Sequence, residues 1–345
     1  MDTGAAIVPV DFLGRAPAPP DPPSFVNLSI TMRCNLRCHM CDCPNIKVSE
    51  PTPDRWLAFI DRLGDWLPTG TQVLVTGGEP MLHHRCVDFV ERLASFGLKV
   101  ALNTNGTLLN VDKVERLKDA GLSILNVSVD GLAATHDRLR NGPGSFQGIV
   151  DILHYVGKHT DWTLHVVPVI NAQNHREMPE VVRFFTADPR IKAMHFQSVI
   201  PTMGKPWDDG FFDRDALWPK SSDEAEAIAA TLETLKEMKR DGAHIDNPEA
   251  QFSVWQRYFR NPRNGLTGNE CRVAYGSLIA QSNGDLTFCD VFGPVGTIDD
   301  DVRAMWESTF AQNRRDDMSR CNLPCNYRVN CCFDESTDPA PADAT

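Results

Sequence analysis

The chain has 345 residues, of which 42% are hydrophobic and 23% are charged, and its formal net charge is −12. This acidic balance argues against a general affinity for nucleic acid or anionic membranes, and no apolar run approaches the roughly 20 residues that cross a bilayer. The N-terminus lacks a basic segment followed by an apolar one, which a secretory signal requires. We therefore expect a cytoplasmic protein that binds neither nucleic acid nor membrane.

Strands and helices alternate along most of the chain. A proline-rich arm is predicted over residues 1–23 and a first strand over 24–30. Further strands are predicted at 71–76, 99–105, 124–131, 163–170 and 192–200, with helices at 51–67, 84–97, 111–121, 145–158 and 178–188. Apolar strands separated by helices require crossover connections, which give a parallel sheet covered by helices. We predict an α/β fold, with a partial (β/α)6 barrel similar to a TIM barrel over residues 24–202.

The last third of the chain has a different pattern. Residues 203–265 predict a helical connector, with helices over 221–242 and 248–259. A small C-terminal domain is predicted over 266–334, with a hairpin at 277–289 that turns at Asn283-Gly284 and a short helix at 302–309. The tail over 335–345 is expected to be disordered.

Most of the eleven cysteines fall into two groups. The first is "CNLRCHMCDC", directly after the first strand, and contains Cys34, Cys38, Cys41 and Cys43; the second contains Cys271, Cys289, Cys321, Cys325, Cys331 and Cys332. Disulfide frameworks belong to small secreted domains, so these groups indicate metal binding or catalysis. Three thiolates spaced C-x3-C-x2-C can hold three irons of a four-iron cluster and leave one iron open. Half of a zinc site is the alternative, while Cys86 lies in an amphipathic helix and is expected in the core.

The first cysteine group, with the motifs that follow later strands, resembles the radical S-adenosylmethionine (radical SAM) enzymes. Their signature is C-x3-C-x-Φ-C, and this chain has Met40 where an aromatic residue is usual. "TGGEP" (76–80), "NTNG" (103–106) and "SVDG" (128–131) each end a predicted strand, as in that family. In such barrels the ligand lies at this end of the strands.

This resemblance implies a set of ligands. A [4Fe-4S] cluster would be held by Cys34, Cys38 and Cys41, and S-adenosylmethionine would contact Met40, Gly77, Gly78, Glu79, Pro80, Asn103, Ser128, Asp130 and Arg140. Glu79 would face the cofactor ammonium, and Arg140 would face its carboxylate, because a guanidinium matches a carboxylate bidentately. Asn103 and Ser128 could instead be ordinary strand-end residues, and Arg140 a solvated salt-bridge partner.

The second cysteine group resembles the SPASM or shorter twitch extension of radical SAM enzymes. A two-cluster SPASM domain has seven cysteines and this group has six, so the resemblance implies one auxiliary [4Fe-4S] cluster. Its implied ligands are Cys271, Cys289, Cys321 and Cys325, with Cys331 or Cys332 as possible substitutes. A zinc knuckle is the alternative.

The single-cluster extension resembles the radical SAM dehydrogenases of aminoglycoside and aminocyclitol biosynthesis. It implies that a 5′-deoxyadenosyl radical removes a hydrogen from an aminosugar or aminocyclitol, that a secondary alcohol becomes a ketone, and that the auxiliary cluster accepts the electron. A flavodoxin- or ferredoxin-type protein would be the reductant. One alternative is an epimerase or a peptide maturase that forms thioethers, in which Cys43, Cys331 or Cys332 could donate hydrogen. Another is a non-catalytic iron-sulfur or zinc protein. The sequence identifies no catalytic side chain.

Overall fold

The computed structural model describes residues 21–201, 208–262, 271, 273–321, 323 and 325–330. The predictions for residues 1–20, for the tail at 335–345 and for Cys331 and Cys332 lie outside the described residues. No helix within the described ranges is both long and apolar enough to cross a membrane.

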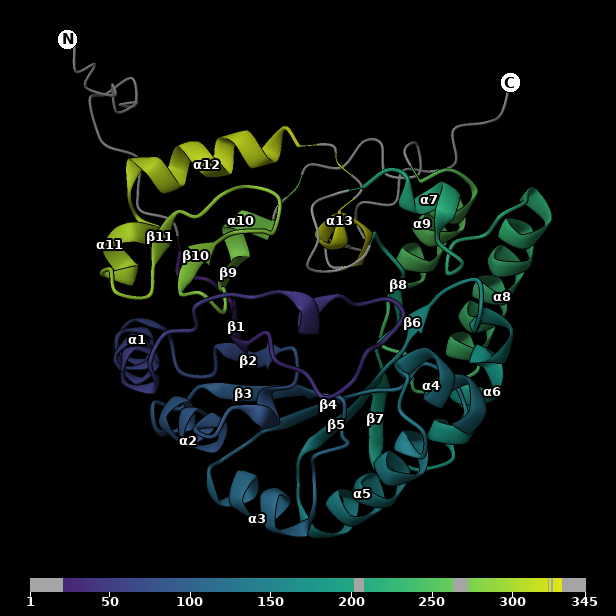
Figure 1. Cartoon of the computed structure of the whole chain (residues 1–345), viewed down its shortest axis with the longest axis horizontal. Helices are drawn as coiled ribbons and strands as arrows, with labels where there is room; N and C mark the ends of the chain where they lie inside the picture. The colour runs from purple at the N-terminus through teal and green to yellow at the C-terminus, as the bar shows by residue number, and fades with distance from the viewer. Residues whose placement is uncertain are drawn as a thin grey trace.

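A curved, mostly parallel sheet forms the centre of the molecule (Figure 1). In the described part of the chain its order is β11-β10-β9-β1-β2-β3-β4-β5-β7. The bounds are β1 Phe25–Thr31, β2 Gln72–Gly77, β3 Lys99–Thr104, β4 Ile124–Ser128, β5 Thr163–Val167, β7 Ile191–Met194, β9 Ser277–Ala280, β10 Asp285–Thr287 and β11 Gly296–Thr297. Strands β1, β2, β3, β4, β5 and β7 pair in parallel in this order. The predicted α/β fold with a partial parallel barrel is confirmed.

Helices cover the outer face of the sheet (Figure 1). They include α1 Pro53–Trp66, α2 Cys86–Ser95, α3 Val111–Asp119, α4 Ala133–Arg140, α5 Ser145–His159 and α6 Met178–Thr186, with the short η1 Cys43–Asn45, η2 Pro80–Leu82 and η3 His175–Glu177. In α1 the fully buried residues Trp56, Phe59, Ile60 and Leu63 repeat at helical spacing, so one side of the helix packs onto the sheet. Cys86 belongs to the same core, as expected.

Further helices complete the chain beyond the barrel. They are α7 Phe211–Arg214, α8 Ser222–Arg240, α9 Glu249–Arg260, α10 Val273–Gly276, α11 Val302–Trp306, α12 Thr309–Ser319 and α13 Asn326–Asn330. Strand β9 pairs in parallel with β1, and β10 returns antiparallel to β9. The predicted hairpin therefore extends the sheet of the barrel past its first strand.

Two predicted strands are each divided in the structure. The predicted strand 163–170 breaks at Pro168 into β5 and β6 Val169–Ile170, and 192–200 divides into β7 and β8 Gln197–Ser198. Proline has no N–H to donate to the ladder, so the pairing is interrupted there. Strands β6 and β8 form a separate small parallel sheet.

Candidate active site

The cysteine loop extends from the end of β1 across neighbouring strand ends to α4. Asn35 Nδ2 donates to Thr107 Oγ1 (2.8 Å) in the loop after β3. The backbone N–H of His39 donates to the carbonyl of Leu139 in α4 (2.9 Å). The loop that carries Cys34, Cys38 and Cys41 is therefore tied to the carboxyl ends of the strands, where barrel enzymes place their ligands.

Two glycines at the end of β2, Gly77 and Gly78, let this loop lie close to the sheet. The N–H of Gly78 donates to the carbonyl of Thr31 (2.7 Å), and that of Glu79 donates to the carbonyl of Arg33 (2.8 Å). A Cβ on Gly77, whose φ is +139°, would lie 2.1 Å from the Thr31 oxygen, and one on Gly78 would lie 2.4 Å from the Arg33 oxygen. Any larger residue would push the cysteine loop away from β2.

Glu79 joins the ends of β2 and β3. Its carboxylate accepts hydrogen bonds from the N–H of Met81 (3.0 Å), the hydroxyl of Thr104 (2.9 Å) and the N–H of Asn105 (2.8 Å). The side chain is fully buried, and this burial raises its pKa, although the three hydrogen bonds favour the charged form. Its contact with a cofactor ammonium stays a prediction.

Polar N–H groups surround two of the loop sulfurs. Asn105 Nδ2 lies 3.7 Å from Cys34 Sγ, and the N–H of Leu36 lies 3.5 Å from the same sulfur. Arg140 Nη1 lies 3.9 Å from Cys38 Sγ. Burial raises the pKa of Cys34, and it raises that of Cys38 to about 11. A metal that binds these thiols must therefore displace their protons, and the N–H donors then stabilise the thiolates.

Cys41 differs from its two partners because Cys43 lies against it. A hydrogen bond with the Cys43 side chain lowers the pKa of Cys41 to about 6 and raises that of Cys43. Cys43 is buried. The thiol that is not counted among the three ligands thus stabilises one of them as a thiolate.

Asp130 and Arg140, both predicted to contact the cofactor, form a buried ion pair. Arg140 Nε donates to Asp130 Oδ2 (2.5 Å), and the N–H of Val169 donates to Asp130 Oδ1 (2.8 Å). Asp130 is fully buried and the Arg140 side chain is only 12% exposed, so this arginine is not a solvated salt-bridge partner. The ion pair holds the guanidinium between β4 and Cys38.

The remaining predicted cofactor contacts lie near this site. Asn103 Oδ1 accepts a hydrogen bond from Asn126 Nδ2 (2.7 Å) on the neighbouring strand, and Ser128 is the last residue of β4. Pro80 is buried in η2, while Met40 packs against the core from the cysteine loop.

Sequence reasoning missed two neighbouring histidines, His165 in β5 and His195 directly after β7. In β5, Leu164 and Val166 are buried toward the helices, so His165 between them faces the interior, in register with Asn126. Burial lowers the pKa of His165, with Asp246 and His195 acting on it as nearby charges. His195 Nδ1 lies 3.0 Å from Asp246 Oδ1. His195 and Asp246 are 51 positions apart in the chain, and no short sequence motif contains both.

The C-terminal cysteines are partly brought together. Cys271, Cys289 and Cys325 are buried, and Cys321 is half-buried. Burial and, to a smaller extent, the nearby Cys325 raise the pKa of Cys289 to about 11. The four-cysteine set stays a prediction.

The loop residues fit the cluster that the sequence predicts. Within the described residues, no three Cys, His, Asp or Glu side chains meet as the ligands of one metal ion would. A four-iron cluster is a larger body, and its thiolates stand farther apart than those around a single ion. Three thiols on one loop, with N–H donors beside two of the sulfurs, are the donor set that such a cluster requires.

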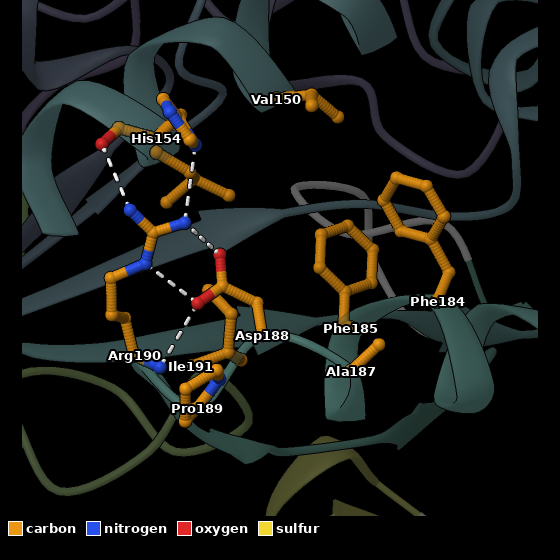
Figure 2. Close-up of a pocket in the computed structure, with 10 residues that line it drawn as sticks. Val150, His154, Phe184, Phe185, Ala187, Asp188, Pro189, Arg190 and Ile191 are labelled. Carbon is orange, nitrogen blue, oxygen red and sulfur yellow. Dashed lines mark hydrogen bonds and ion pairs between the residues drawn. The ribbon is translucent and has the colours of Figure 1, made fainter.

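A surface hollow of about 430 Å³ lies away from this site, between α5 and the turn from α6 to β7 (Figure 2). Arg190 lies between Asp188 and His154, and Phe184 and Phe185 form the opposite wall (Figure 2). The hollow opens at the amino end of β7, so it does not adjoin the cysteine loop.

Comparisons with known proteins agree with this geometry. The family model described as "Radical SAM superfamily" matches residues 28–185. The chain is similar to an AdoMet-dependent heme synthase of Methanosarcina barkeri, with 30% identity over 52% of this chain and 52% of that protein. It is also similar to a PqqA peptide cyclase of Rhodopseudomonas palustris, with 27% identity over 69% of this chain and 64% of that protein. The chain thus spans roughly half to two thirds of these curated relatives.

Among solved structures, the fold is similar to that of Streptococcus suis SuiB bound to S-adenosylmethionine. The TM-score is 0.65 and the identity 16%, with 85% of this chain and 68% of that chain covered. Because the sequence identity is low, this likeness is one of fold.

Proposed function

We propose, from the premise that residues 28–185 form a radical SAM domain, that this chain oxidises a secondary alcohol of an aminosugar or aminocyclitol to a ketone. Cys34, Cys38 and Cys41 would hold a four-iron cluster, which with bound S-adenosylmethionine would supply the radical chemistry that takes the carbinol hydrogen. The C-terminal cysteines would hold a cluster that accepts the second electron.

The protein holds and shields these groups. The Gly77-Gly78 turn brings the cysteine loop to the end of β2, and the N–H groups of Asn105 and Arg140 stabilise the thiolates of Cys34 and Cys38. Asp130 fixes the Arg140 guanidinium, which can also meet a carboxylate of the cofactor.

The observation that carries the dehydrogenase proposal is the contact between His195 and Asp246 directly after β7, where both side chains are accessible (37% and 41% exposed). Asp246 accepts a hydrogen bond from Nδ1 of His195, which leaves Nε2 of the imidazole to take a proton. Oxidation of the alcohol releases one hydrogen atom, one proton and one electron. The His195–Asp246 pair would take the hydroxyl proton as the carbonyl bond forms.

Peptide modification is the second candidate. The alignment with the PqqA peptide cyclase covers 69% of this chain, against 52% for the heme synthase. Another structure of similar fold is SuiB bound to its precursor peptide SuiA (TM-score 0.63). If the modification is an epimerisation, it needs a thiol that donates hydrogen, and Cys43 is buried against Cys41. Deuterium uptake from solvent into a peptide product would favour this candidate over alcohol oxidation.

The test is anaerobic reconstitution with iron and sulfide, followed by S-adenosylmethionine, dithionite and a panel of aminocyclitols that begins with 2-deoxystreptamine. We expect 5′-deoxyadenosine in a one-to-one ratio with a product that has lost two hydrogens. No 5′-deoxyadenosine under any condition would refute the enzyme proposal. Turnover of a precursor peptide without any ketone would refute the dehydrogenase.

A further inference from the structure

Two asparagine side chains pair with the outer backbone edge of the segment that ends the barrel. Asn247 Oδ1 accepts from the N–H of Phe196 (2.7 Å), and its Nδ2 donates to the Phe196 carbonyl (2.9 Å). Asn330 makes the same pair of bonds with Ser198, two residues after Phe196. Its Oδ1 accepts from the N–H of Ser198 (2.8 Å), and its Nδ2 donates to the Ser198 carbonyl (3.0 Å). A primary amide offers the same donor and acceptor as a peptide group, so the two side chains replace a neighbouring strand.

These amides belong to one buried network. Asn247, Gln251 and Asn330 are each at most 2% exposed. Asn247 Nδ2 donates to Gln251 Oε1 (2.8 Å), and Gln251 Nε2 donates to the backbone carbonyl of Asn330 (3.0 Å). Because every partner is buried, loss of one amide would leave backbone groups of the barrel edge without hydrogen bonds.

The network connects two segments that are 132 residues apart in the chain. Asn330 ends α13, which begins directly after Cys325 and lies beside β8 (Figure 1). Trp255 Nε1 also donates to the carbonyl of Val329 (2.7 Å), so α9 holds the same turn. The C-terminal cysteine segment is thus attached to the barrel through the last turn of α13.

We propose that Asn330 is a positioning residue that fixes the auxiliary cysteine segment at the carboxyl end of the barrel, and so sets the distance between the two clusters. This inference rests on the proposed function, because it assumes a cluster on Cys325 and its partners. Electron transfer out of the substrate site depends steeply on such a distance. An amide with both groups bonded to one residue of the barrel edge fixes position and orientation together.

The test compares Asn330→Leu with Asn326→Leu in the reconstituted full chain. Asn326 lies one turn earlier on α13 and is half-buried, and its side chain accepts a hydrogen bond only from Asn330 Nδ2 among the contacts described (3.0 Å). In Asn330→Leu, hydrogen exchange of the Ser198 amide, and so of the segment 196–199, should rise at least about tenfold, because Ser198 loses its acceptor. The spin–spin coupling between the two reduced clusters, measured by electron paramagnetic resonance, should also change. Asn326→Leu should leave exchange at 196–199 and the coupling as in the unmodified protein.

Unchanged exchange at 196–199 in Asn330→Leu would overturn the inference, and so would an unchanged coupling. Asn330→Ala removes the same acceptor without placing a branched apolar side chain in the buried site, and it should increase exchange even if the leucine variant does not fold. If the unmodified chain binds only about four irons, the auxiliary-cluster part of the proposed function fails. The exchange experiment then still decides whether Asn330 attaches α13 to the barrel.

Discussion

The two cysteine regions are built in opposite ways. Cys34, Cys38 and Cys41 lie within eight consecutive positions on one loop, and backbone bonds from Gly78 to Thr31 and from Glu79 to Arg33 anchor that loop to the next strand. The C-terminal cysteines come from segments spread over positions 271–325, and buried side-chain amides hold the last of them. The ligands of the first site are local in sequence, whereas those of the second are brought together only by tertiary packing.

This difference matches the two tasks that the proposed function assigns. A site that generates a radical needs three ligands in a fixed geometry, and one short loop anchored to the neighbouring strand supplies all three. An electron acceptor needs a fixed distance from another centre, which only contacts between distant segments can set. Variants in one region should therefore leave the task of the other region intact.

The largest expected contrast comes from removal of one thiol in each region. Cys38→Ser should abolish 5′-deoxyadenosine formation and remove about four of about eight irons per chain, because the open-iron cluster loses a ligand. Cys289→Ser should also remove about four irons but leave 5′-deoxyadenosine formation in place. Iron analysis and chromatography of the nucleoside measure both, with Cys86→Ala as the control in which a core thiol is lost and the iron stays. If Cys289→Ser also stops 5′-deoxyadenosine formation, the two regions are not separate sites.

The second prediction concerns the step between the two regions. His195→Gln should lower ketone formation by about 10²- to 10⁴-fold, because the alcohol loses its proton acceptor, while 5′-deoxyadenosine continues to form. Asp246→Asn should also raise the ratio of 5′-deoxyadenosine to ketone, since Asp246 orients the imidazole of His195. The measurement is the ratio of 5′-deoxyadenosine to ketone with an aminocyclitol that the unmodified enzyme oxidises. His154→Gln, at the outer hollow, is the control, and equal loss of both products in His195→Gln would indicate a structural role only.

The same contrast explains what could be predicted from the sequence. The loop thiols could be found because their spacing is itself the signal, and the alternation of apolar strands and helices was enough for the parallel barrel. His195 and Asp246 could not be paired, because the contact depends on where 244–246 returns to the edge of β7. The contact between Asn330 and Ser198 was hidden for the same reason. By contrast, the break at Pro168 had a local signal, the missing N–H of proline, and the expectation of one continuous strand was wrong.

The third prediction tests how closely the cysteine loop must approach β2. Gly78→Ala should lower the free energy of unfolding by about 1–3 kcal/mol, because the new Cβ would lie 2.4 Å from the Arg33 oxygen. Gly148→Ala in α5 is the matched control, since a Cβ there meets nothing within 4 Å and should stabilise the helix by about 0.5–1 kcal/mol. Thermal melting of the reconstituted protein measures both changes. If Gly78→Ala melts at the same temperature as the unmodified protein, the close approach of the cysteine loop to β2 is not required.

The smallest expected effect is a shift in the reduction potential of one cluster, because the hydrogen-bond donors to the cysteine sulfurs differ between the two regions. Cys34 Sγ lies near a side-chain donor, Asn105 Nδ2 (3.7 Å), in addition to the backbone N–H of Leu36 (3.5 Å), whereas the donor described at Cys289 Sγ is the backbone N–H of Phe292 (3.5 Å). Asn105→Asp removes the side-chain donor and should make the potential of the first cluster more negative, by about 59 mV for each tenfold change in its one-electron equilibrium. The second cluster should not shift, because its backbone donor is untouched.

The control for this shift is Asn35→Asp, which adds the same charge beside the loop. Asn35 accepts a hydrogen bond from Asn105 Nδ2 (3.0 Å) and donates to Thr107, so neither of these bonds goes to a sulfur. Redox titration followed by electron paramagnetic resonance measures both clusters in one sample. If Asn35→Asp shifts the first cluster as far as Asn105→Asp does, added charge alone explains the change. If Asn105→Asp shifts the potential of the first cluster further than Asn35→Asp does, the excess comes from the lost N–H donor of Asn105. Cys289 would not show such an effect, because its described donor is the backbone N–H of Phe292.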